Sequence, residues 1–222
     1  MSRAKYSEEA RNAIMASFVK ATKDLIASEG MDAVSIRRVS AAAGYSSATL
    51  YLYFDDINEL VTMSLISSLE AYIRDIIETT PDDETPRAEY LRTWQISCRH
   101  AFADPATYLD LFYGPRSRDL DVIAQKYYEL FPEELGQANR RMLNMLAGGS
   151  LSRRNYAVLD SFAGELGLSE DEAKLANDLT IAYFRSFLEQ VRDAEPSPAE
   201  IDELTSRFMR GALFVLRDTA DA

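Results

Sequence analysis

The chain has 222 residues, 47% of them hydrophobic, which is enough apolar material for the core of one large or two small domains. No stretch approaches the roughly 18 apolar residues of a membrane-spanning helix, and the first residues lack the apolar core of a signal peptide, so we expect a cytoplasmic protein with no membrane partner. Cys98 and His100 are the only cysteine and the only histidine, which are too few ligands for a zinc site, so we expect neither a metal nor a cofactor.

Charge is unevenly distributed along the sequence. Residues 1–54 carry seven basic and five acidic side chains, a net charge of +2, and because the whole chain has −12, the remaining residues carry −14. Such a contrast hints at a segment that faces nucleic acid, joined to an acidic body that aids solubility.

The spacing of apolar residues predicts helices along the chain and no strand, which is an all-α fold. A first helix is expected over residues 7–30, because apolar side chains recur at helical spacing up to a terminal glycine. Ser35 can cap a short second helix that stops at Gly44, and Ser46 can cap a third helix over residues 47–54.

A long fourth helix is expected after Asp55 or Asp56, either of which can cap its first turn. Its apolar spacing continues to about Glu78, so we predict one helix up to that residue. The segment that follows is rich in proline, aspartate and threonine and therefore marks a break.

Later helix starts are also marked by local sequence signals. Pro86 and Pro105 each fit the first position of a helix. The sequences SEDE at 169–172 and SPAE at 197–200 each match a capping box, in which a serine and a glutamate three residues later satisfy each other's backbone N–H groups. We therefore expect these two motifs to open the last two helices.

The last two helices carry apolar stripes over residues 176–191 and 201–216. These stripes are too wide for a helix that lies alone on a surface, so we predict a homodimer through these helices. Phe187 and Leu204 lie within the stripes, and we expect a charge at either position to produce monomer or aggregate.

The second and third helices, joined by a turn at Gly44, predict a helix-turn-helix, whose second helix presents its N-terminal side chains to the major groove of DNA. Hydroxyl and small side chains there can contact base edges, and tyrosine and arginine side chains can reach phosphates. The predicted DNA-binding residues are Arg37, Ser46, Ser47, Ala48, Thr49, Tyr51 and Tyr53.

One enzymatic alternative has to be weighed. The sequence GYSSA at 44–48 is one residue short of the G-x-S-x-G motif of serine hydrolases, but that motif follows a strand, whereas an alanine-rich helix precedes it here. His100 would have to serve as the base. We therefore expect that the protein is not an enzyme.

Residues 14–65 resemble the DNA-binding domain of the tetracycline-repressor (TetR/AcrR) family of bacterial transcription regulators. The positions that match the family pattern are Ser35, Arg37, Ala42, Ala43, Gly44, Ser46, Thr49, Leu50, Tyr51, Tyr53, Phe54, Glu59 and Leu60. The resemblance implies an N-terminal helix-turn-helix domain of three helices, residues 1–55, and a helical ligand-binding and dimerisation domain, residues 56–222. It also implies a homodimer, usually a repressor, that binds a palindromic operator in double-stranded DNA and is released by a small-molecule effector.

Two positions depart from the family pattern. Ile57 stands where relatives often have a basic residue that grips phosphate, and Tyr45 stands where a small aliphatic residue is usual. These departures leave open an alternative function, a dimeric small-molecule sensor or scaffold with weak or lost operator binding.

The middle of the chain is aromatic, which suits an apolar or planar ligand, although aromatic residues at helical spacing are more often core. The predicted ligand-binding residues are Trp94, His100, Tyr108, Phe112, Tyr127 and Tyr156. Arg92, Arg99 and His100 could pair with an anion, but we expect them to be solvated side chains. No motif identifies the effector.

Overall fold

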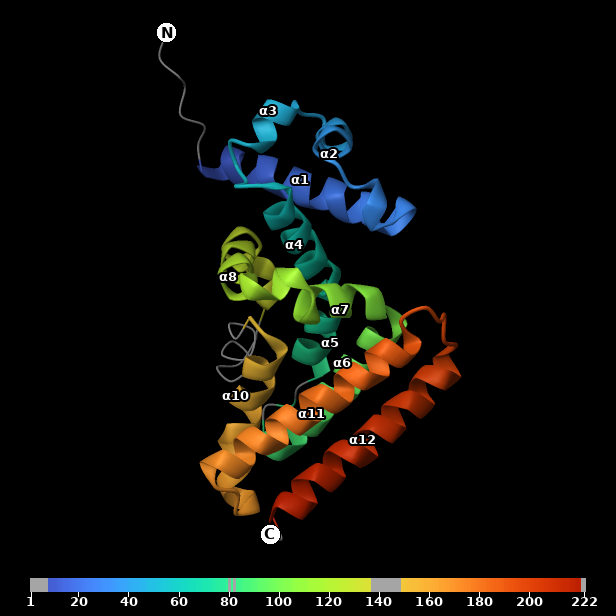
Figure 1. The fold of residues 1–222 in the computed structure, drawn as a ribbon. Coiled ribbons are helices and arrows are strands. Elements are labelled where there is room, and N and C mark those ends of the chain that lie inside the picture. Colours follow the sequence, from blue (N-terminus) through green and yellow to red (C-terminus); the bar gives the residue numbers. More distant parts are fainter. Residues whose placement is uncertain (1–7, 80, 82, 137–148, 221–222) are drawn as a thin grey trace. The chain divides into compact units, whose positions relative to one another are not determined.

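The computed structural model describes residues 8–79, 81, 83–136 and 149–220, and within these ranges every regular element is a helix (Figure 1). The prediction of an all-α fold is confirmed. The chain forms two compact units, one of Met1–Glu70 with Ile123–Pro132 and the other of Ala71–Val122 with Glu133–Ala222. The first unit thus extends beyond residue 55, and the functional division at that residue stays a prediction.

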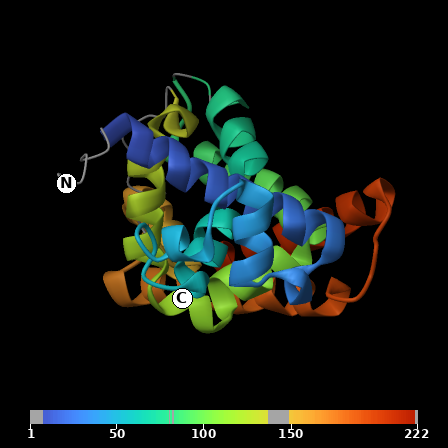
Figure 2. The same ribbon diagram turned by 90° about the horizontal axis from the view of Figure 1, so that it is seen from above.

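The first unit is built on helix α1, which packs against α2 and α4, while α2 packs against α3. Figures 1 and 2 both show α2 lying beside α1. The helices and the short 3-10 helix of this unit are α1 (Glu8–Glu29), η1 (Met31–Ala33), α2 (Ile36–Ala43), α3 (Ser47–Leu50) and α4 (Ile57–Ser68).

The predicted caps set the starts of these helices. The side chains of Ser35, Ser46 and Asp56 accept hydrogen bonds from the backbone N–H three residues ahead and so begin α2, α3 and α4. Gly44 ends α2 with a φ of 79°, a left-handed conformation that glycine adopts without steric cost. The chain therefore turns sharply between α2 and α3.

Two predicted helix lengths are wrong. The third helix ends at Leu50 and continues as a turn rather than reaching residue 54. The fourth helix stops at Ser68, and α5 (Glu70–Thr79) follows after Leu69. The N–H of Leu69 bonds to Ile66 three residues back, which tightens the backbone. The apolar spacing continues across this point because α4 is largely buried and α5 buries one face, so it did not reveal the break.

The second unit packs α12 against α6 and α11, and α10 against the same two helices. Its predicted starts are confirmed, since Thr85 and Asp104 cap α6 and α7 and a complete capping box opens α11. Helix α8 begins in this unit and ends in the first. The helices are α6 (Pro86–Ala103), α7 (Pro105–Tyr113), α8 (Leu120–Leu130), α10 (Leu151–Ala163), α11 (Glu170–Val191) and α12 (Pro198–Ala220), with 3-10 helices η2 (Pro115–Arg118), η3 (Pro132–Leu135) and η4 (Gly164–Leu166).

The core of the second unit is aromatic. The Trp94 ring lies 5.0 Å from the ring of Phe184 and 4.9 Å from that of Phe208, which joins α6 to α11 and α12. At Gly211 a Cβ atom would lie only 2.3 Å from the ring of Tyr183, so the close approach of α11 and α12 requires a glycine there. None of the helices in the described ranges is long and apolar enough to cross a membrane.

Candidate nucleic-acid interface and ligand cavity

The surface formed by α2, α3 and the turn after α3 carries most of the predicted DNA contacts in exposed positions. Leu50 is fully buried and anchors α3 in the core, whereas Tyr51 and Leu52 after it are 57% and 64% exposed. Leu52 was not among the predicted residues, although a large apolar side chain is rarely left in solvent. The exposed predicted residues are Arg37, Ser46, Ser47, Ala48 and Tyr51, and the half-buried ones are Thr49 and Tyr53.

The hydroxyl groups of α3 have different roles. Ser46 Oγ accepts the N–H of Thr49 at 3.2 Å and lies 2.9 Å from Thr49 Oγ1, so both hydroxyls already have a partner. Ser47 and Ala48 lie exposed in the first turn of α3, where side chains of a recognition helix meet base edges. They are the residues of α3 best placed for direct readout.

The arginines beside α3 are also distinguished by their contacts. Arg38 pairs with Glu29 at 2.5 Å, and this hydrogen bond and the arginine's charge lower the pKa of the Glu29 carboxyl. Arg11 lies 5.8 Å from the centre of the Tyr53 ring, close enough for a cation–π contact. Arg37 is exposed and remains the best candidate on α2 for a phosphate contact.

The unusual Tyr45 is explained by packing. Its ring lies 5.4 Å from that of Phe18 in α1, so the larger side chain covers the core where a small one is usual in the family. Ile57, the other departure, is half-buried at the first position of α4.

The start of α4 is held by a cluster that the sequence did not suggest. Glu59, only 8% exposed, accepts hydrogen bonds from the N–H of Asp55 at 2.7 Å and from Lys126 Nζ at 2.6 Å. This contact raises the pKa of Lys126, mainly through the hydrogen bond to Glu59. The two side chains are 67 residues apart in the sequence, so no local pattern joins them.

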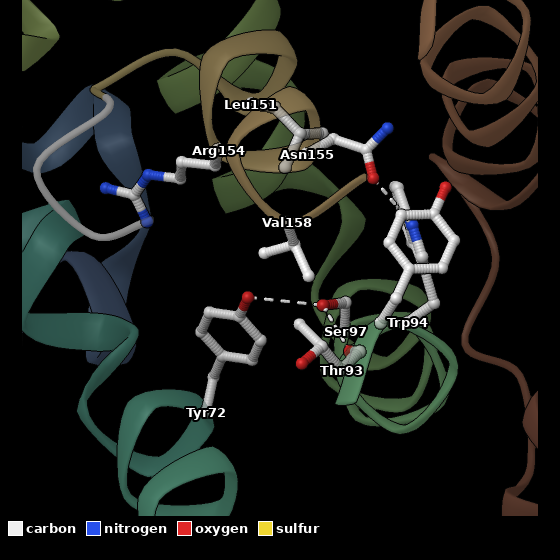
Figure 3. Close-up of a pocket in the computed structure, with 9 residues that line it drawn as sticks. Tyr72, Thr93, Trp94, Ser97, Leu151, Arg154, Asn155 and Val158 are labelled. Atoms are coloured by element: carbon white, nitrogen blue, oxygen red, sulfur yellow. Dashed lines mark hydrogen bonds between the residues drawn. The ribbon is translucent and has the colours of Figure 1, made fainter. Parts of the chain in front are cut away.

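A cavity in the second unit lies between α5, α6 and α10 (Figure 3). Its volume is about 20 Å³. This is room for a single water in the present conformation, so a larger ligand has to widen the cavity. The residues that line it are Tyr72, Tyr90, Thr93, Trp94, Ser97, Leu151, Arg154, Asn155 and Val158.

Hydrogen bonds fix one wall of this cavity. Trp94 Nε1 donates to Asn155 Oδ1 at 2.8 Å, and Asn155 Nδ2 donates to Asn177 Oδ1 at 2.8 Å (Figure 3 shows the first bond). Ser97 Oγ donates its one proton to the backbone oxygen of Thr93 at 2.7 Å and lies 3.2 Å from the hydroxyl of Tyr72. The two bonds made by Asn155 link α6, α10 and α11 and satisfy polar groups that are buried.

The predicted ligand-binding residues are not gathered in one place. Trp94 lines the cavity. Tyr108 and Phe112 are buried beside it, with the Tyr108 ring 6.3 Å from that of Tyr72. Tyr127 belongs to the first unit, and Tyr156 lines a shallow hollow near the start of α11. A role in ligand binding stays a prediction for all of them.

The three side chains considered for anion binding all have acidic partners. Arg92 pairs with Glu84 at 2.9 Å. Arg99 lies 3.3 Å from Asp202, and His100 Nε2 lies 2.7 Å from Asp75. The residue that sequence reasoning missed is Arg154, which lines the cavity and is only 3% exposed. In the described ranges, no cluster of three or more histidine, cysteine, aspartate or glutamate residues could hold a metal ion.

The comparisons with known proteins agree with this architecture. Residues 18–62 match the bacterial regulatory proteins of the tetR family. The chain is similar in structure to RolR in complex with resorcinol, at 15% identity over 96% of each chain and a TM-score of 0.54. It is also similar to a proposed transcriptional regulator from Pseudomonas aeruginosa (19% identity, 97% of each chain, TM-score 0.52). A proposed TetR-family regulator from Mesorhizobium loti gives 15% identity over 92% of this chain and 97% of that one, with a TM-score of 0.54. No curated protein matches the sequence.

At these identities the similarity of structure establishes the fold, and the match over residues 18–62 identifies the helix-turn-helix. Residues 18–62 therefore match the tetR family of bacterial regulatory proteins, and the chain shares its all-α fold with these solved transcriptional regulators.

Proposed function

We propose that the protein is a ligand-responsive repressor that works in the cytoplasm. Two copies bind a palindromic operator in double-stranded DNA, and a small molecule held in the second unit releases them. The observation that carries this proposal is the exposed surface of α2 and α3, where Arg37, Ser47, Ala48 and Tyr51 surround a buried anchor at Leu50. This arrangement leaves short side chains facing outward at the start of a recognition helix.

Dimerisation is supported by the outer face of the last two helices. Leu175 and Leu179 of α11 lie four residues apart and are 54% and 46% exposed, and Phe214 of α12 is 64% exposed. Large apolar side chains grouped on the surface of a single chain favour burial against a partner. Phe187 and Leu204 are instead 2% and 9% exposed within the chain, so charges at these positions would disrupt the core and would not report on the dimer alone.

Ligand response is supported by the cavity in the second unit. Its walls combine apolar and aromatic side chains with a few polar groups, as small-molecule sites do. RolR, which has a similar fold, was solved with the small aromatic molecule resorcinol. A ligand that binds better to the conformation with low DNA affinity shifts the protein toward that conformation and so releases the operator.

The test is a fluorescence-anisotropy titration against DNA from beside the protein's own gene. We expect tight binding to one fragment and weak binding to DNA of unrelated sequence. Ser47→Ala and Thr49→Ala should change which sequence is preferred, because they alter contacts to bases. Tyr53→Phe should weaken all sites about equally, since a phosphate contact carries no base information. Equal losses on every sequence for the α3 variants would contradict these roles.

The same titration tests the second candidate, a dimeric sensor or scaffold without operator binding. The side chain of Asp55 is 92% exposed at the start of α4, and Asp56 next to it is exposed as well. Carboxylates at this position repel phosphate. Equal affinity for every DNA fragment, together with a dimer in solution, would favour the sensor over the repressor.

A further inference from the structure

The cavity in the second unit is lined by a buried cation that has no anionic partner among the described residues. Arg154 of α10 is 3% exposed and lines the cavity, and in Figure 3 its side chain lies on the side opposite Trp94 with the guanidinium group turned away from Val158. Its Nε and Nη1 atoms have no hydrogen-bond acceptor among the residues that the structure describes. These two nitrogens carry three of the five N–H donors of a guanidinium group.

Such an arrangement is costly for the folded protein. A charge buried without a counter-charge destabilises the folded protein, because it loses its hydration and gains no ion pair in return. The contact recorded for the guanidinium is with the ring of Phe112, whose centre lies 5.4 Å away, and a cation–π contact compensates only part of this cost. By comparison, Arg116 of η2, in the same unit, pairs with Asp110 at 2.6 Å. An anion in the cavity would supply the partner that Arg154 lacks.

A buried tyrosine hydroxyl adds a further donor near this cavity, on Tyr108, whose ring lies 6.3 Å from that of Tyr72. Ser97 Oγ gives its single proton to the backbone oxygen of Thr93 at 2.7 Å, so the Tyr72 hydroxyl, 3.2 Å from Ser97 Oγ, is engaged with Ser97. The hydroxyl of Tyr108 is buried and has no partner in the described ranges. Burial raises the pKa of both phenols. Both hydroxyls therefore stay protonated, and that of Tyr108 can donate to a ligand.

Apart from Thr93, Ser97 and Asn155, the remaining walls are apolar or aromatic. Leu151, Val158 and the ring of Trp94 surround the space between the polar groups. A ligand that satisfies the whole cavity thus has one anionic end and a small, flat apolar body.

We propose that this cavity binds a small aromatic carboxylate, with the carboxylate on Arg154 and the ring against Trp94, Leu151 and Val158. The inference rests on the proposed function in one respect, because this ligand is taken to be the effector. Binding widens the cavity, since the space now open holds only a water molecule.

Trp94 is the only tryptophan in the chain and lines the cavity, so its fluorescence reports on the site directly. The experiment titrates the full chain with benzoate, with benzamide as the neutral analogue and with inorganic phosphate as an anion without a ring. We expect a saturable fluorescence change with benzoate and at least tenfold weaker binding of the other two probes. No saturable change with benzoate, or equal affinity for benzamide, would overturn the proposal.

The matched variants are Arg154→Met and Arg153→Met, neighbours on α10 of which only Arg154 is buried. Arg153 is exposed and pairs with Asp121 at 3.0 Å, so its replacement should leave benzoate affinity unchanged. Arg154→Met should lose at least tenfold in benzoate affinity, and retention of wild-type affinity would overturn the proposal. If Arg154→Met does not fold, Arg154→Lys and the comparison of benzoate with benzamide on the wild-type chain decide the question.

DNA binding measured in parallel separates the two claims. Specific DNA binding without benzoate binding would contradict this inference and leave the repressor function standing. Benzoate binding that depends on Arg154 but does not release DNA would support the site and contradict its role as the effector site.

Discussion

Replacing Lys126 with methionine should destabilise the first unit more than an ordinary surface ion pair would. Lys126 Nζ lies 2.6 Å from Glu59, whose side chain is 9% exposed, while the lysine side chain is 45% exposed. Exposed ion pairs contribute about 0.2–1 kcal/mol to stability, and breaking a fully buried pair costs about 3–5 kcal/mol. Breaking this half-buried pair should therefore lower the free energy of unfolding by about 1–2 kcal/mol. For a chain of this size the loss corresponds to a melting temperature lower by about 2–8 °C.

The matched control is Lys174→Met. Lys174 also lies 2.6 Å from its partner, Glu170, but the two side chains are 53% and 74% exposed. Urea denaturation followed by circular dichroism should give a loss below about 1 kcal/mol for this control. A double variant that adds Glu59→Gln should recover part of the loss at Lys126, because it removes the unpaired charge. Equal losses for the two lysine variants, or no recovery, would refute the argument from burial.

Three further outcomes follow from the structure. Ile57→Lys should tighten binding to every operator equally, because a cation there contacts phosphate and not a base. Unchanged affinity in anisotropy titrations would exclude a phosphate contact at this half-buried position. Leu179→Glu combined with Phe214→Glu should give folded monomers in analytical ultracentrifugation, and a persistent dimer would place the interface elsewhere. Hydrogen bonds from Ser169 lower the pKa of Glu172 below its ordinary value, so the cap stabilises the protein above about pH 4.5 and this stabilisation is lost as the pH falls further. Thermal melts of Glu172→Gln at several pH values should lack this part of the acid dependence.

Features set by neighbouring residues could be predicted from the sequence. Ser35, Ser46 and Asp56 begin their helices as expected, because a capping side chain bonds a backbone N–H only three residues away. The turn at Gly44 follows from the left-handed conformation that glycine adopts easily. These local features were enough to predict the helix-turn-helix and the exposed surface around Ser47.

Features that depend on distant contacts could not be predicted. The break at Leu69 lies within a continuous apolar pattern, and Glu59 meets Lys126 only after the chain has folded. Aromatic periodicity is the same for a core and for a cavity wall, so it did not separate Trp94, which lines the cavity, from Tyr127, which lies in the other unit. The burial of Arg154 in the cavity wall could not be predicted from the sequence, because an arginine on a helix is usually solvent-exposed.

The most direct test of the central claim is selection of bound sequences from a library of random duplex DNA by the full chain. A dimeric helix-turn-helix protein should enrich an inverted repeat, because its two recognition helices contact two half-sites related by symmetry. A variant with Arg37, Ser47 and Tyr51 all replaced by alanine should enrich nothing. Failure of the wild-type chain to enrich any sequence, or enrichment of the same repeat by the variant, would contradict the assignment of operator binding to this surface.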